Sequence, residues 1–147
     1  MNENTIKHLE FIQNSITRMN ANSFQIKGMS VTITAALLAL YASSGKPFYI
    51  LIAIIPTIIF WFLDAYYLQQ ERKFRGIYND VAELSNSETR VLVRIFEMPL
   101  QKYSGGKYSY WNVFWSRTIW LFYLFPIVFL LVTTILLSKC VVLCKLL

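Results

Sequence analysis

The chain has 147 residues, enough for one domain, and 56% of them are hydrophobic. This share exceeds the roughly 45–50% of an ordinary soluble domain. The formal net charge is +6, which in a membrane protein more often reflects Lys and Arg retained on the cytoplasmic side than nucleic-acid binding. Three stretches carry no charged residue, namely 28–44, 47–63 and 118–138. We therefore expect an all-α membrane protein with three transmembrane helices and no DNA or RNA partner.

Residues 1–27 have the pattern of an amphipathic cytoplasmic helix. Apolar side chains recur at intervals of three and four residues from position 4 onward: Ile6, Leu9, Ile12, Ile16 and Met19. No Pro or Gly interrupts this pattern before Gly28, so the helix can continue into the first apolar stretch. Its apolar side either packs against neighbouring helices or lies on the bilayer surface. The polar character of the segment does not fit a cleaved signal peptide.

Residues 28–68 are expected to form a transmembrane helical hairpin. The first apolar stretch is rich in small and hydroxyl residues, which let helices approach closely in lipid, and residues 43–47 read Ser-Ser-Gly-Lys-Pro, a turn sequence. Pro56 lies in the second stretch and is a kink or flexible point. Asp64 ends that stretch. A carboxylate at the bilayer centre costs about 2.5–3.5 kcal/mol, so we expect Asp64 to lie at the membrane boundary or to pair with a cation, with a gating or ion-pathway role as the alternative.

Residues 69–117 form the one sizeable polar region, a cytoplasmic helical insert. The second helix is expected to continue into it, because Phe74, Ile77, Tyr78, Val81 and Leu84 keep helical spacing. Ser85 and Glu88 have the spacing of a capping box, which predicts a helix over residues 86–98 that Pro99 ends. The side chains expected to face inward on it are Leu92, Ile95 and Phe96. The alternation of apolar residues at positions 91, 93 and 95 leaves a short strand as the alternative.

Residues 118–147 are expected to form the third transmembrane helix and a short tail. Pro126 lies inside this helix, either as a flexible point or as a static kink. Cys140 and Cys144 are one helical turn apart and either pack as small hydrophobic side chains, form a disulfide between subunits or carry lipid. Two thiols and the distant His8 do not make a metal site, so we expect no metal and no cofactor.

The distribution of Lys and Arg predicts the orientation in the membrane. Residues 1–27 contain three and residues 69–117 contain eight, whereas the segments expected on the opposite side contain three, at positions 46, 139 and 145. Positive residues stay on the cytoplasmic side. We therefore expect the N-terminus in the cytoplasm and the C-terminus outside.

Two features of the insert are candidate ligand sites. The first is a basic cluster, which either attracts anionic lipid headgroups or binds a ligand: Arg72, Lys73 and Arg75. The second alternates basic and aromatic residues, and is either an aromatic belt at the membrane interface or a pocket for a nucleotide signal, since aromatic faces stack on bases and basic groups hold phosphate: Lys107, Tyr108, Tyr110 and Trp111. Residues 1–27 and 69–117, the parts expected in the cytoplasm, are too small for an independent core, so we expect a homo-oligomer.

The sequence offers no catalytic constellation. The apolar stretches contain hydroxyl residues but no His or Lys partner for them, and Asp64 is the lone acid nearby. Acid–base catalysis needs groups of matched pKa within reach of one another. We therefore expect that the protein is not an enzyme.

The order of parts resembles a known group of proteins. A polar helix enters the first span through Asn-Ser-Phe-Gln-Ile-Lys-Gly at 22–28, two close spans and an insert follow, and Ser-Arg-Thr at 116–118 opens the last span. This layout resembles the small bacterial membrane effectors of anti-phage signalling, particularly the Pycsar-type transmembrane effector. The resemblance implies a bacterial inner-membrane protein in which a cyclic nucleotide made during infection changes the oligomer, damages the membrane and stops growth. The alternatives are a membrane-anchored scaffold or regulatory subunit for a soluble partner protein, and a constitutive channel.

Overall fold

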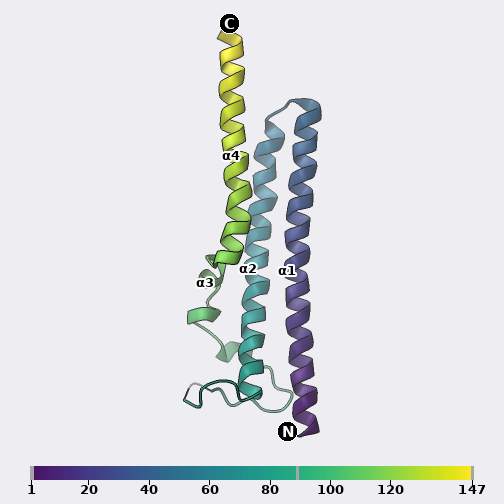
Figure 1. Ribbon diagram of the computed structural model, residues 1–147, viewed down its shortest axis with the longest axis vertical. Helices are drawn as coiled ribbons and strands as arrows, with labels where there is room; N and C mark the ends of the chain where they lie inside the picture. The colour runs from purple at the N-terminus through teal and green to yellow at the C-terminus, as the bar shows by residue number, and fades with distance from the viewer. Residues whose placement is uncertain (1, 89, 147) are drawn as a thin grey trace. The chain divides into compact units, whose positions relative to one another are not determined.

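The computed structural model describes the backbone of residues 2–88 and 90–146, and the side chains of that range up to residue 136. The described chain is helical and contains no β-strand. The elements are α1 (Glu3–Ser44), α2 (Phe48–Val81), two 3-10 turns, η1 (Leu100–Lys102) and η2 (Gly106–Tyr108), and the helices α3 (Tyr110–Phe114) and α4 (Arg117–Leu146) (Figure 1). Three of the helices, α1, α2 and α4, are long and apolar enough to cross a membrane. The all-α prediction with three long apolar helices is thus confirmed.

The first helix runs without a break from the polar N-terminal segment into the first apolar stretch. α1 has 42 residues, as expected from the lack of Pro and Gly before Gly28. It ends where Gly45 adopts a φ of 65° and its N–H donates to the Tyr41 carbonyl at 2.8 Å. A positive φ is the conformation in which Gly is favoured after a helix, so Gly45 makes the turn into α2.

The second helix continues past the apolar stretch into the polar region, as predicted. α2 has 34 residues and contains Pro56. It ends in a Schellman-type motif, in which the Leu84 N–H donates to the Asn79 carbonyl at 2.8 Å and the Glu83 N–H to the Asp80 carbonyl at 3.4 Å. Glu83 occupies the left-handed position with a φ of 60°. The chain therefore leaves the helix before Leu84, which is exposed, contrary to its predicted place on the helix.

The chain folds into two compact units. The insert unit comprises residues 1–24 and 65–115, and the apolar unit comprises residues 25–64 and 116–147. Both α1 and α2 contribute residues to each unit.

The core of the insert unit is built from the amphipathic faces that the sequence shows. Its buried members come from α1, from α2 and from the chain after η1: Ile12, Ile16, Phe74, Ile77 and Tyr103. The N-terminal half of α1 thus uses its apolar side to pack against protein, although Ile6 at the start of the predicted stripe is exposed.

The predicted helix over residues 86–98 is wrong. The described part of this segment is irregular, and Asp80 at the end of α2 explains why. Its carboxylate accepts the Val91 N–H at 3.3 Å and its backbone carbonyl accepts Arg90 Nε at 3.1 Å, which draws the chain back along α2 in place of a new helical turn.

The side chains at positions 91 to 93 follow the alternating pattern rather than the helical one. The half-buried Val91 and Val93 pack on the insert-unit core, whereas Leu92 is 86% exposed. Ile95 and Phe96, also predicted to face inward, are exposed. The alternation therefore holds for Val91 and Val93 but not for Ile95, and the described residues form no strand here.

The core of the apolar unit joins residues of α1, α2 and α4. Ile50 and Ala53 of α2 are buried with Leu130 of α4, and side chains of α1 including Leu37 pack on them. The hydroxyls of Thr34 and Thr57 lie 3.3 Å apart. Several small residues of α1 lie instead on its exposed side: Gly28, Thr32, Ala35, Ala36 and Ala39.

Candidate functional site

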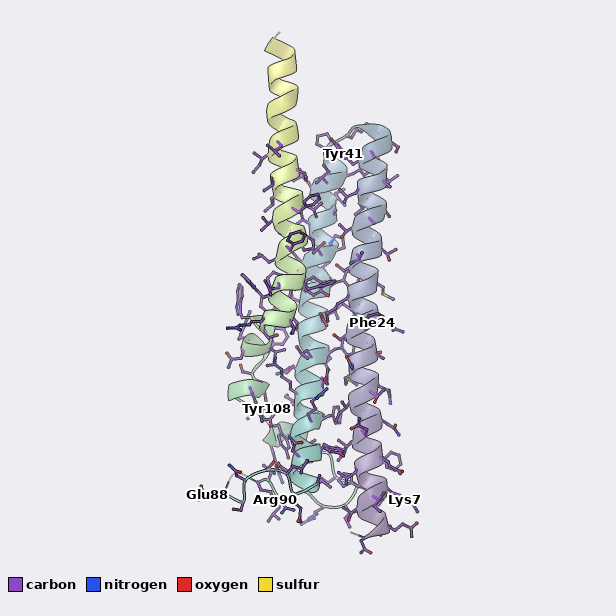
Figure 2. The ribbon with its side chains drawn as sticks, viewed as in Figure 1. Lys7, Phe24, Tyr41, Glu88, Arg90 and Tyr108 are labelled. Atoms are coloured by element: carbon purple, nitrogen blue, oxygen red, sulfur yellow. The ribbon has the colours of Figure 1, made fainter. Side chains whose placement is uncertain are left out.

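A pocket in the insert unit gathers several of the residues that the sequence singles out. It has a volume of about 330 Å³, and its lining comes from two segments, α2 and η2: Arg72, Arg75, Gly76, Asn79, Lys107 and Tyr108. Four of the seven predicted ligand residues thus meet in one place, although the two segments are about 30 residues apart in the sequence. Tyr108 is labelled beside α2 in Figure 2.

Two side-chain hydrogen bonds hold η2 against α2. The Gln69 amide donates from Nε2 to the Tyr108 carbonyl at 2.9 Å, and Arg72 donates from Nη1 to the Lys107 carbonyl at 3.3 Å. Both bonds are accepted by backbone carbonyls of η2, so they hold η2 in place independently of the side chains at positions 107 and 108. Arg72 therefore shapes the pocket as well as lining it.

Gly76 lets the aromatic wall of the pocket approach the helix. A Cβ added at this position would lie 2.5 Å from the Tyr108 hydroxyl oxygen and 2.7 Å from Cδ1 of Tyr103. The two tyrosine rings pack edge to face, with centroids 5.5 Å apart. Any larger residue at position 76 would push this wall away from α2. Nothing local in the sequence indicates this role, because the contact joins position 76 to residues about 30 positions later.

The electrostatics of the pocket favour an anion. Arg75 is held by Glu71, whose Oε1 accepts from Nε and lies 2.8 Å from Nη2. Lys107 Nζ lies 5.1 Å from the centroid of the Tyr108 ring, a cation–π geometry. Arg72, Arg75 and Lys107 thus contribute three positive charges against the single carboxylate of Glu71, and the Arg forks can bind phosphate or carboxylate.

A buried tyrosine–carboxylate pair supports the pocket wall from behind. Tyr103 is buried and its hydroxyl donates to the Asp80 carboxylate. Burial, with the nearby Asp80 charge, raises the pKa of Tyr103 well above its usual range. The hydroxyl therefore stays protonated and keeps donating at any physiological pH. Neither residue was singled out from the sequence, since nothing local links positions 80 and 103.

The other predicted ligand residues lie elsewhere. Lys73 is on α2 but does not line the pocket, and Tyr110 and Trp111 belong to α3. Burial raises the pKa of Tyr110, and Trp111 is 62% exposed. The second predicted cluster is therefore divided between the pocket and a separate aromatic surface.

Asp64 forms a buried ion pair in the apolar unit. The side chain is fully buried, and its Oδ2 lies 2.6 Å from Nζ of Lys27 on α1. The buried Tyr123 of α4 lies beside the carboxylate, with its ring stacked on Trp61 at 6.2 Å between centroids. The expected pairing with a cation is thus the arrangement observed, and the cluster joins all three long helices.

The remaining candidates of the sequence have simpler places. Pro56 and Pro126 lie inside α2 and α4, which both continue through them. In the part of the chain that the structure describes, no three His, Cys, Asp or Glu side chains come together as a metal site. The side chains of Cys140 and Cys144 lie outside the described residues.

Comparison with known proteins adds no relative: no protein-family model, no curated protein and no solved structure matches the chain.

Proposed function

We propose that this protein is an oligomeric membrane effector of bacterial anti-phage defence that responds to an anionic small-molecule signal, with a cyclic nucleotide as the first candidate. The observation that carries the proposal is the pocket of Arg72, Arg75, Lys107 and Tyr108, which offers cations and an aromatic face to one ligand. Such a combination suits phosphate next to a planar ring. The layout of three spans around a small insert supports the defence role through its resemblance to such effectors.

The proposed topology places α1, α2 and α4 across the inner membrane. The insert unit faces the cytoplasm, because the Lys and Arg residues concentrate in its segments, and the C-terminus lies outside. A cytoplasmic signal then reaches the pocket directly.

The proposed mechanism is a shift between two arrangements of the same oligomer. A ligand in the pocket bridges α2 and η2, and η2 precedes α4 by a short connection. A ligand can shift such an equilibrium only by its different affinity for the two states. We propose that the ligand-bound arrangement of the insert favours the oligomer that perturbs the membrane and halts growth.

The test follows membrane potential in bacteria that express the chain during phage challenge. The wild type should depolarise the cell only after infection or after nucleotide is supplied. Lys107→Ala and Arg75→Gln should need about tenfold more nucleotide, since a hydrogen bond to a charged group is worth about 1.5–3 kcal/mol. Lys46→Ala is the matched control, because Lys46 is an exposed lysine in the turn between α1 and α2. Steady depolarisation without a stimulus would instead indicate a channel.

The second candidate function is a membrane-anchored scaffold for a soluble partner. Exposed apolar side chains in the insert unit favour it, and four of them lie in the segment after α2: Leu84, Leu92, Ile95 and Phe96. Such side chains outside a membrane often mark contact with protein. Co-purification of a soluble partner that Leu92→Ser with Phe96→Ser abolishes, together with no depolarisation in any condition, would favour the scaffold over the effector.

A further inference from the structure

The segment that leads into α4 has positive charge and no carboxylate. Glu97 is the last acidic residue of the chain, and the cations between it and α4 are Lys102 and Lys107, with Arg117 opening the helix. The same segment is rich in aromatic residues. It therefore has the charge to approach an anionic surface without a repelling group of its own.

The helical turn formed by α3 and Trp115, the residue that follows it, has two different sides. Val113 and Phe114 are buried, whereas Trp111 and Trp115 are 62% and 60% exposed. Residues four apart on a helical turn share one face, so the two indoles are neighbours on the exposed side.

The exposed indoles are supported from within α3. The Phe114 ring packs edge to face on the rings of Trp111 and Trp115, at centroid distances of 5.8 and 5.4 Å. The Asn112 amide donates to the Gly106 carbonyl at 2.8 Å and ties α3 to η2. The ring contacts of Phe114 and the hydrogen bond of Asn112 therefore hold the two tryptophans in place.

We propose that Trp111 and Trp115, here called the indole surface, dock on the headgroup layer of an anionic bilayer. Tryptophan prefers this layer because its ring is apolar and its N–H is polar. Only Ser116 separates Trp115 from Arg117, the first residue of α4, so the indole surface lies next in the chain to a helix proposed to cross the membrane. The cations of the segment complement phosphatidylglycerol-type headgroups. The proposal rests on the proposed membrane crossing of α4 but not on the ligand pocket.

The test uses the full chain reconstituted in vesicles of equal parts phosphatidylcholine and phosphatidylglycerol. Tryptophan fluorescence is quenched by lipids brominated either near the headgroup or near the bilayer centre. The chain has four tryptophans, so W111F with W115F should remove about half or more of the shallow quenching. All four lie close to the ends of the apolar stretches, so Phe129→Trp, at an exposed position near the middle of the stretch 118–138, supplies the reference for deep quenching, which W111F with W115F should leave unchanged. W61F is the control and should leave the shallow quenching largely unchanged, because Trp61 is buried.

The outcomes separate this proposal from the membrane topology. Shallow quenching that survives W111F with W115F, while deep quenching is normal, would overturn the docking of the indole surface alone. Absence of deep quenching with Phe129→Trp would overturn the membrane crossing as well. Quenching of Trp111 and Trp115 by aqueous acrylamide but not by lipid would place them in water or against another protein. Equal shallow quenching in pure phosphatidylcholine would overturn the preference for anionic lipid.

Discussion

The buried ion pair between Lys27 and Asp64 allows a double-mutant test of what holds the long helices together. Lys27→Met leaves a carboxylate that is fully buried with no cation at 2.6 Å. Asp64→Leu leaves a lysine that is only partly shielded, since its side chain is 26% exposed. The two single variants therefore differ in which charge is stranded, and the double variant strands neither.

The expected magnitude follows from this burial. Breaking a buried pair by removing one partner costs about 3–5 kcal/mol, and we place Lys27→Met near 3 kcal/mol because some water reaches the lysine. With about 2–4 °C per kcal/mol for a chain of this size, its melting temperature in detergent should fall by about 6–12 °C. The double variant should lie within about 2 kcal/mol of the wild type, because replacing both charges by apolar groups is often neutral, whereas the buried Tyr123 hydroxyl loses the acceptor beside it.

Circular dichroism melting of the purified variants in one detergent measures these shifts, and Lys46→Ala, in the exposed turn, is the control. If the double variant is as unstable as the worse single variant, the packing of the side chains rather than their charges holds the helices, and the reasoning fails.

In the depolarisation assay, Asp64→Ala should change activity more than Lys46→Ala at equal protein levels. Equal effects would remove the case for a functional role of Asp64.

Three further predictions concern the insert unit. Gly76→Ala should destabilise the protein by about 1–3 kcal/mol, as overpacking does, and should weaken nucleotide binding in equilibrium dialysis; unchanged binding would mean that Tyr108 is not part of the site. Tyr103→Phe should lower stability by about 1–2 kcal/mol, because the Asp80 carboxylate loses the hydrogen bond from the buried hydroxyl. The wild type should lose stability as the pH rises above about 10, where Tyr103 ionises in the unfolded chain before the folded one, and the variant should lack this part of the loss. An identical pH profile of the two proteins in denaturant titrations would contradict this. Glu83→Gly should raise the free energy of unfolding by about 0.5–1 kcal/mol, and with it the melting temperature, because Gly adopts a φ of 60° without strain. A lower melting temperature would show that the Glu83–Arg90 ion pair matters more.

The sequence predicted the parts of the fold that depend on local pattern. The continuity of α1 and the reach of α2 beyond the apolar stretch follow from helical spacing and from the lack of Pro and Gly. The pairing of Asp64 could be expected because an isolated carboxylate is costly in an apolar setting, but its partner Lys27 lies 37 positions away and no local rule selects it. The helix over residues 86–98 failed because a capping box is a weak local signal, and the long-range bonds of Asp80 to Arg90 and Val91 outweigh it.

The sequence could predict which residues belong to the basic and aromatic clusters, but not that some of them meet in one pocket. The basic and aromatic clusters were visible, but their meeting depends on the bonds from Gln69 and Arg72 to the backbone of η2. Every residue has a backbone carbonyl, so the sequence does not show which carbonyls accept such bonds. For the same reason the sequence could not divide Tyr108, which lines the pocket, from Trp111, which lies on the exposed side of α3.

The tight approach of two tyrosine rings to Gly76 restricts how this protein can vary. Every other amino acid carries a Cβ, which would meet Tyr108 at 2.5 Å. A change at position 76 therefore reshapes the pocket wall whichever residue replaces Gly. A pocket adapted to another ligand would therefore change at lining positions that already carry a side chain, such as Asn79 or Lys107, rather than at Gly76.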